Sequence, residues 1–284
     1  MTKILVTGGH GQLASCIREV AADTEAYQFV YVDYDELDIT KEIEVERFLA
    51  TGFFQFCVNC AAYTAVDKAE SEPEMAKKIN VDGVLNLAKA CKSHQIKLIQ
   101  ISTDFVFDGF QSIPYDENIT TNPLGVYGKT KLCGEKAITD LLEEYFILRT
   151  SWLYSGYGHN FLKTMLNLAG ERESLSVVCD QIGTPTYGID LANVILGIIR
   201  NNTDKYGCYH YSNEGVASWY DFTKAIVELS GLECKVLPIM SYDYPTPAKR
   251  PFFSVFDKTK IKTNLGIEIP YWRDSLKTCL QNNS

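Results

Sequence analysis

The chain has 284 residues, enough for one or two domains, and its hydrophobic content of 46% is ordinary for a soluble globular protein. A formal net charge of -9 argues against a large nucleic-acid surface, because such a surface needs a basic stripe. No apolar run reaches the ~18 residues of a membrane span, and the N-terminal run is too short for a signal peptide, so we expect a cytoplasmic protein with no membrane or nucleic-acid partner.

The first apolar segment, residues 3–7, predicts a strand that leads into a glycine-rich turn and then a helix. The turn reads as Gly9-x-Gly11-x-x-Ala14 or as Gly8-x-x-Gly11-x-x-Ala14. In this context glycines let the backbone approach a pyrophosphate, and the helix N-terminus offers free N–H groups to it. The pattern favours dinucleotide binding over the alternative of a plain tight turn.

A second strand is predicted over residues 29–32, and it ends at Asp33. This acid lies about 20 residues past the turn, where a carboxylate that binds the cofactor ribose is expected. No Arg follows it to receive a 2′-phosphate, which favours NADH over NADPH. Asp38 and Ile39 begin the next loop and are candidates for the adenine pocket, although Asp38 is equally compatible with a surface turn.

The third predicted strand, residues 54–60, contains Cys57 and Cys60 and opens into Ala61 and Ala62. Residues three apart on a strand point to opposite faces, so we interpret the two cysteines as separate thiols and not as a redox pair. The odd number of nine scattered cysteines also indicates reduced thiols. The small residues after the strand leave room for a cofactor at the sheet edge.

A long helix is predicted over residues 73–94, with the polar Asn80 in its middle. Spacing alone leaves open whether Asn80 faces solvent or braces the backbone of an active site. The fourth strand, residues 97–101, ends in Ser102-Thr103-Asp104. Hydroxyl groups at the carboxyl end of a parallel strand lie where open α/β sheets bind their ligands.

The next helix is expected to start with Asn122 as its cap and Pro123 at its first position, and to run to about Glu144. It carries Tyr127 and Lys131, which four-residue spacing places on one face. A nearby cation favours the phenolate and lowers the pKa of a tyrosine, which suits the pair to general acid catalysis. The alternative is an exposed helix with an incidental pair.

A fifth strand is predicted over residues 145–149, so strand and helix alternate through the first half of the chain. This alternation predicts an α/β fold with a doubly wound parallel (Rossmann) sheet. We expect residues 1–151 to form the dinucleotide-binding domain. Residues 152–284 should form mainly a smaller C-terminal substrate-binding lobe, with some segments packing back on the sheet. Expected in that half are helices over residues 161–170, 189–200 and 219–230 and strands over 176–179 and 207–211.

The glycine turn, the hydroxyl groups after strand four and the Tyr-x-x-x-Lys pair occur in the order found in extended short-chain dehydrogenase/reductases. Within that superfamily the chain resembles the dTDP-4-dehydrorhamnose reductase family. The resemblance is carried by residues 59–70 (NCAAYTAVDKAE), 102–109 (STDFVFDG), 127–131 (YGKTK), 149–152 (RTSW), 180–186 (DQIGTPT) and 249–251 (KRP).

The resemblance implies reduction of the 4-keto group of dTDP-4-dehydro-L-rhamnose to dTDP-L-rhamnose with NADH or NADPH, a step of nucleotide-sugar and surface polysaccharide biosynthesis. It implies that Tyr127 donates the proton, that Lys131 binds the nicotinamide ribose and that Thr103 holds the carbonyl oxygen. Asp104 and Trp152 match sugar-contacting positions of the family. Implied cofactor positions are Gly8, His10, Gly11, Gln12, Leu13, Asp33, Asp38, Ile39, Ala61, Ala62, Tyr63, Thr64, Tyr127 and Lys131.

Lys249 and Arg250 are candidates for the pyrophosphate of the nucleotide sugar, because Arg forms forked bonds to phosphate, although a solvated loop pair explains them as well. Acids that hold a metal between subunits in some family members are missing here, so we expect no metal and a monomer or homodimer. Two other functions remain open. One is a different nucleotide-sugar reductase or epimerase, and the other is a non-catalytic dinucleotide-binding regulatory subunit of the same fold.

Overall fold

A computed structural model describes residues 1–22 and 26–282 of the protein. Its centre is a six-stranded sheet in the order β10-β5-β4-β3-β1-β2, in which every neighbouring pair is parallel. The strands are β1 (Thr2–Thr7), β2 (Tyr27–Val32), β3 (Phe56–Asn59), β4 (Lys97–Thr103), β5 (Tyr145–Thr150) and β10 (Gly207–His210). The predicted doubly wound parallel sheet is confirmed.

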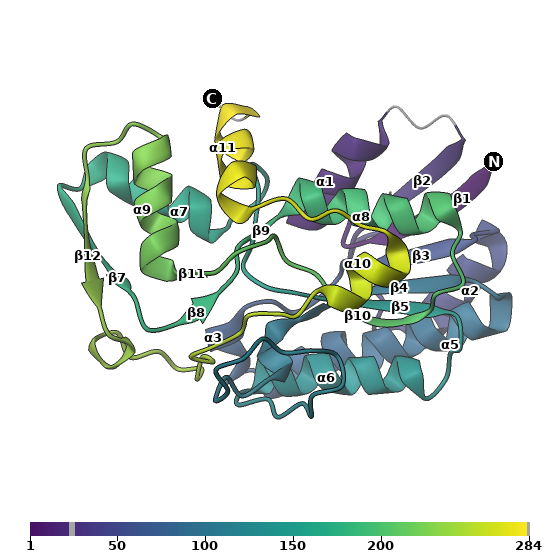
Figure 1. Ribbon diagram of the computed structural model, residues 1–284. Coiled ribbons are helices and arrows are strands. Elements are labelled where there is room, and N and C mark those ends of the chain that lie inside the picture. Colours follow the sequence, from purple (N-terminus) through teal and green to yellow (C-terminus); the bar gives the residue numbers. More distant parts are fainter. Residues whose placement is uncertain (23–25, 283–284) are drawn as a thin grey trace.

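Helices cover both faces of this sheet (Figure 1). Helices α1 (Gln12–Ala21) and α8 (Gly188–Asn201) pack together on one face, and α2 (Glu42–Gly52), α5 (Val84–His94) and α6 (Val126–Thr139) cover the other. The apolar residues of α8 recur three or four positions apart, which places them on one stripe against the sheet. Those buried in the core are Leu191, Ala192, Val194, Ile195, Ile198 and Ile199.

The second half of the chain contributes to both parts of the molecule. Strand β10 pairs with β5, and α8 and α10 (Thr259–Leu265) pack on the main sheet. The remaining elements form the smaller lobe at the left of Figure 1. They include α7 (Phe161–Glu171), α9 (Trp219–Leu229) and the paired strands β7 (Ser174–Val178) and β12 (Lys235–Ile239). The exact division at residue 151 stays a prediction.

Short elements connect the lobe to the sheet. Strand β6 (Leu153–Tyr154) pairs with β9 (Thr186–Tyr187), and β8 (Ile182–Gly183) pairs with β11 (Ala217–Ser218). Helix α9 starts with a capping box, in which Ser218 and Asp221 satisfy each other's backbone N–H groups. The C-terminal helix α11 (Trp272–Asn282) packs its buried face on α9 and β9.

The catalytic-helix candidate does not begin where the sequence predicted. Helix α6 starts at Val126 and ends at Thr139, so the expected span of 122–144 is wrong. The side chain of Asn122 donates to the Asp108 carboxylate at 3.1 Å, and Asn122 lies in the loop before α6. The cap residue is Gly125, which has no side chain to accept a hydrogen bond.

The predicted helix over residues 73–94 is interrupted. Helix α4 (Pro73–Lys77) passes into a π-helical turn, η1 (Lys78–Gly83), and then into α5. Asn80 lies in this turn and is 1% exposed. Widened turns of this kind are frequent at functional sites. Here the turn directs the Asn80 side chain toward the loop that follows β3.

A buried ion pair joins α6 to the strand beside it. The guanidinium of Arg149 on β5 donates to both carboxylate oxygens of Glu135 on α6, with the shortest distance 2.6 Å. The two residues are 6% and 4% exposed. The Ser102 hydroxyl at the end of β4 also donates to Glu135. Glu135 therefore fixes α6 against the neighbouring strands β4 and β5.

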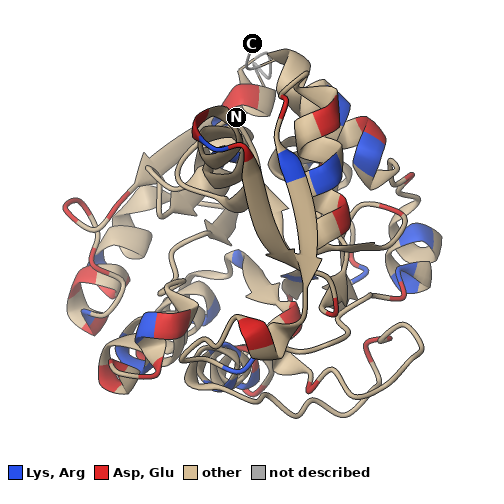
Figure 2. Cartoon of the chain, turned by 90° about the vertical axis from the view of Figure 1, so that its left-hand side faces the viewer, with Lys and Arg blue, Asp and Glu red and all other residues tan. Residues whose placement is uncertain are grey.

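The surface carries charges of both signs. In Figure 2, segments coloured as Lys or Arg are interspersed with segments coloured as Asp or Glu over the helices and loops in view. Across residues 1–22 and 26–282, none of the helices combines the length and apolarity that crossing a membrane requires.

Candidate active site

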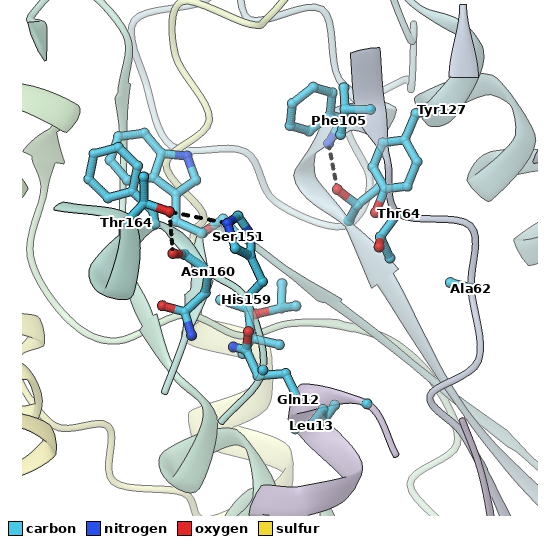
Figure 3. Close-up of a pocket in the computed structure, with 18 of the residues that line it drawn as sticks. Gln12, Leu13, Ala62, Thr64, Phe105, Tyr127, Ser151, His159, Asn160 and Thr164 are labelled. Atoms are coloured by element: carbon cyan, nitrogen blue, oxygen red, sulfur yellow. Dashed lines mark hydrogen bonds between the residues drawn. The ribbon is translucent and has the colours of Figure 1, made fainter. Parts of the chain in front are cut away.

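A large cleft lies between the carboxyl ends of the sheet strands and the smaller lobe. Its volume is about 1740 Å³, which is ample for a dinucleotide and a second ligand. Residues that follow β1, β3, β4 and β5 line it on one side, and α7, β7 and α9 line it on the other. Figure 3 shows labelled side chains from both sides directed into this space.

The glycine turn between β1 and α1 lets the backbone come close to a ligand. Gly8 has a φ of +64°, and a Cβ there would lie 2.8 Å from the backbone nitrogen of Ala61, so only glycine fits. Gly11 precedes α1 and provides no side-chain cap, which leaves the first N–H groups of the helix available to an anion. Gln12 and Leu13 begin the helix and line the cleft. The turn fits the pyrophosphate of a dinucleotide.

Asp33, the carboxylate predicted from the sequence to bind the cofactor ribose, follows the end of β2. Asp33 lines the cleft and accepts hydrogen bonds from the backbone N–H groups of His10 at 2.7 Å and Tyr34 at 2.8 Å. His10 is mostly exposed at the cleft edge. Asp38 is 6% exposed and lies beside Ile39 in the cleft wall, so the surface-turn alternative for Asp38 is wrong.

The loop after β3 is held by hydrogen bonds to Asn80 in the π-helical turn. Ala61, Ala62 and Thr64 line the cleft, whereas Tyr63 lies outside its lining. The Tyr63 backbone N–H donates to Asn80 Oδ1 at 2.9 Å, and Asn80 Nδ2 donates to the Tyr63 carbonyl at 3.1 Å. The structure thus decides between the two alternatives for Asn80, which braces the loop and does not face solvent.

Tyr127 is the second residue of α6, and Lys131 follows one turn later. Both line the cleft together with Thr103, so the structure brings the three catalytic candidates to one place. Lys131 Nζ donates to the carbonyl oxygen of Ile101 at 2.7 Å. The Phe105 ring meets the Tyr127 ring edge-on with centroids 5.5 Å apart. Figure 3 shows Tyr127 and Phe105 at the same wall.

The Thr103 hydroxyl both donates and accepts a hydrogen bond. It donates to Asp104 Oδ1 at 3.0 Å and accepts from the Phe105 backbone N–H at 3.2 Å. Thr103 and Asp104 are 5% and 2% exposed. Burial raises the pKa of Asp104 to about 6, although hydroxyl groups of Thr103 and Ser254 oppose the shift. Since a hydroxyl has one proton, Thr103 must turn away from Asp104 to donate to another ligand.

Burial shifts the pKa values of Tyr127 and Lys131 in opposite directions, because it disfavours each charged form. It raises the pKa of Tyr127 to about 12, with Thr103 opposing and Asp104 adding to the shift. It lowers the pKa of Lys131 to about 8, and the Glu135 carboxylate partly offsets this. The expected lowering of the Tyr127 pKa is therefore wrong, and the Tyr127 phenol is protonated at neutral pH.

Trp152 enters the cleft from the end of β5. Its φ of +49° is rare for a bulky residue and turns the chain at this point. Its indole stacks on that of Trp219, with ring centroids 3.6 Å apart and planes inclined by 8°. Sequence reasoning missed the lobe wall around this pair, because no motif marks apolar residues that only the tertiary fold gathers. That wall includes Phe161, Met165, Leu168, Val177, Trp219 and Ile239.

Only one of the two basic candidates near the C-terminus lines the cleft. Arg250 lines the cleft, whereas Lys249 is exposed and lies outside the lining. Arg250 forms a forked pair with Asp67, with its nitrogens 3.0 and 2.7 Å from the two carboxylate oxygens. No group of three His, Cys, Asp or Glu side chains in residues 1–22 and 26–282 is placed to hold a metal ion. The absence of a metal stays a prediction.

Cys57 is buried on β3, and Cys60 is partly buried where β3 ends. Both are free thiols, and their interpretation as separate thiols and not as a redox pair stays a prediction. Burial raises the pKa of the Cys60 thiol well above its ordinary value. Cys60 also lines the cleft.

The parallel sheet, the uncapped glycine turn and the Tyr127–Lys131 pair at the strand ends define a nicotinamide-dinucleotide oxidoreductase of the extended short-chain dehydrogenase/reductase class. Comparison with known proteins narrows this class. The family model described as RmlD substrate binding domain matches residues 1–284. The chain belongs to this family.

Named relatives agree along the whole chain. A dTDP-4-dehydrorhamnose reductase of Aggregatibacter actinomycetemcomitans is 43% identical, over 98% of this chain and 98% of its own. The crystal structure of a dTDP-4-dehydrorhamnose reductase from Clostridium acetobutylicum has a TM-score of 0.96 and 42% identity, covering 99% of each chain. That of the Bacillus anthracis reductase in complex with NADP has a TM-score of 0.96 and 39% identity, covering 99% of this chain and 100% of its own.

Proposed function

We propose that this protein reduces the 4-keto group of dTDP-4-dehydro-L-rhamnose to dTDP-L-rhamnose with NADPH or NADH. The observation that carries the proposal is the meeting of Thr103, Tyr127 and Lys131 in one cleft, in a chain whose family match spans residues 1–284. The NADP in the Bacillus anthracis relative supports a nicotinamide dinucleotide as cofactor. The intact proton donor argues against a purely regulatory subunit.

The protein's own residues supply the proton and hold the charge. When bound, the reduced nicotinamide supplies the hydride that reaches carbon 4. Tyr127 donates its phenolic proton to the carbonyl oxygen, which its raised pKa of about 12 permits because the group is protonated at neutral pH. The Lys131 ammonium then stabilises the phenolate and binds the nicotinamide ribose. Thr103 turns its hydroxyl from Asp104 toward the same oxygen and stabilises the developing charge.

The remaining site assignments form the rest of this proposal. The cofactor is bound by Gly8, His10, Gly11, Gln12, Leu13, Asp33, Asp38, Ile39, Ala61, Ala62, Thr64 and the Tyr63 backbone, with Tyr127 and Lys131 at the nicotinamide. Asp104 and Trp152 contact the sugar, and Arg250 lies at the pyrophosphate end, with Lys249 next to it outside the cleft lining. The proposal also includes a division into two lobes near residue 151. It further holds that the protein is a monomer or homodimer and that it acts in the cytoplasm.

The test mixes the purified protein with the dTDP-4-keto-6-deoxy-L-sugar, generated in place by the preceding enzymes, and follows absorbance of NADPH and NADH in separate reactions. We expect rapid oxidation of at least one, and the product should co-elute with dTDP-L-rhamnose. The UDP-linked analogue is the control for the base. Oxidation with the UDP sugar alone indicates another nucleotide-sugar reductase, and no oxidation despite tight cofactor binding indicates the regulatory function.

Replacing Asp33 by Ala should weaken NADH binding about tenfold or more, because a charged acceptor for a ribose hydroxyl contributes about 1.5–3 kcal/mol. NADPH should lose less, since its 2′-phosphate is repelled by the same carboxylate. Fluorescence titration of each cofactor measures this. Asp35→Ala is the matched control, as Asp35 is exposed and outside the cleft lining. Unchanged NADH affinity in Asp33→Ala contradicts the ribose assignment.

A further inference from the structure

The N-terminus of α6 lacks a cap of its own although it carries Tyr127. Gly125 is the cap residue and has no side chain, so the first N–H groups of the helix need an acceptor from elsewhere. Glu70, which lies 56 residues earlier, provides it. Its Oε1 accepts the Val126 backbone N–H at 2.8 Å, one residue before Tyr127.

The two sides of this contact fit each other. A Cβ at position 125 would lie 2.5 Å from Glu70 Oε1, so the missing side chain of Gly125 makes room for the carboxylate. The negative charge also lies at the positive end of the helix dipole, where it is favourable. The contact is therefore specific in shape and in charge, although Glu70 is exposed.

Glu70 is held in turn by the short helix α3 (Val66–Ala69) that precedes it. The other acid of α3, Asp67, forms the forked pair with Arg250 and accepts the Ala248 backbone N–H at 3.1 Å. The Arg250 guanidinium keeps the pKa of Asp67 below its ordinary value. Val66 and Arg250 both line the cleft. One short helix thus connects residues 248–250, on the substrate side, to the start of α6.

We propose that Glu70 is a positioning residue for Tyr127, and that α3 acts as a strut that transmits the placement of residues 248–250 to the catalytic helix. Glu70 itself does not touch the reacting atoms. It sets where the first turn of α6 lies, and a small displacement of that turn moves the phenol away from the carbonyl oxygen that it protonates. This inference rests on the proposed reductase function.

Glu70→Ala should lower kcat about five- to twentyfold, on the order of a lost helix cap, with little change in KM or cofactor affinity. Glu70→Gln keeps an acceptor oxygen and should restore kcat to within about twofold of the unmodified protein. Glu74→Ala is the matched control, because Glu74 is an exposed acid in the first turn of α4. Wild-type kcat in Glu70→Ala, or equal losses in both Glu70 variants, overturns the positioning role.

The strut is tested by combining Asp67→Asn with Glu70→Ala. If α3 transmits the placement, the double variant loses much less kcat than the product of the two single losses, because either change disconnects the same element. If the kcat of the double variant falls by the product of the two single losses, α3 does not transmit the placement.

A measurement without substrate separates this inference from the proposed function. Amide hydrogen exchange at Val126 and Tyr127 should rise in Glu70→Ala and not in Glu70→Gln. An inactive wild-type protein refutes the reductase proposal, whereas unchanged exchange in Glu70→Ala refutes the cap.

Discussion

Replacing Tyr127 by Phe is expected to lower kcat by about two to four orders of magnitude while cofactor affinity stays nearly unchanged. The variant removes one oxygen, keeps the ring that packs edge-on against Phe105 and leaves α6 intact. The lost group is the proposed proton donor, and Thr103 cannot replace it because an aliphatic hydroxyl is a far weaker acid than a phenol. Steady-state kinetics and cofactor titration measure the two quantities separately.

Tyr63→Phe is the matched control for this experiment. Tyr63 also loses a phenolic oxygen, but that oxygen donates to Glu72 at 2.8 Å and lies outside the cleft lining. We expect its kcat to stay within about twofold of the unmodified protein, as surface substitutions usually cost little. Comparable activity in Tyr127→Phe would remove Tyr127 from the mechanism, and a parallel loss in both variants would point to the loop after β3 instead.

Replacing Arg149 by Met should destabilise the folded protein by about 3–5 kcal/mol, because it leaves the buried carboxylate of Glu135 without its cation. Glu135 is 4% exposed and accepts from Arg149 through both oxygens, so water cannot take the place of the guanidinium. Urea unfolding followed by circular dichroism measures the change. Activity should fall as well, since α6 carries Tyr127 and Lys131 and is fixed to β5 by this pair.

Two further variants test whether the loss of stability in Arg149→Met comes from the burial of the ion pair or from the loss of a charge alone. Arg273→Met breaks an ion pair of similar length, 2.7 Å, whose side chains are 34% and 67% exposed, and it should cost less than about 1 kcal/mol. Arg149→Met combined with Glu135→Leu removes both buried charges and should regain most of the lost stability. If Arg149→Met lowers the free energy of unfolding no more than Arg273→Met does, the buried pair does not stabilise the position of α6.

Much of the fold could be predicted because its signals are local. Residues 3–7 followed by a glycine turn predicted a strand, a phosphate-binding loop and a helix, and the structure has β1, Gly8 with positive φ and α1 there. The repeated alternation of strand and helix then leaves few topologies, because crossover connections between parallel strands are right-handed. The same topology gathers Thr103, Tyr127 and Lys131 at the carboxyl ends of the strands.

Other features depended on groups that are distant in the chain. Asn122 looked like a helix cap in sequence, but Asp108 holds it in a loop and Glu70 caps the helix four residues later. Arg250 looked like a free phosphate ligand, but Asp67 already binds it. In both places a partner more than ten residues away decides the hydrogen bonding, and no spacing rule identifies that partner.

The sequence by itself determined the parallel sheet and the glycine turn between β1 and α1, and it placed Tyr127 and Lys131 on one helix face, because these follow from periodicity and from residue types at short spacing. Only the tertiary structure decided the protonation of Tyr127, the brace by Asn80 and the cap by Glu70. Burial raises the pKa of Tyr127 although a lysine follows one turn later, and burial is a property of the whole packed chain. The hydrogen bonds of Asn80 and Glu70 join segments 17 and 56 residues apart, which folding alone brings together.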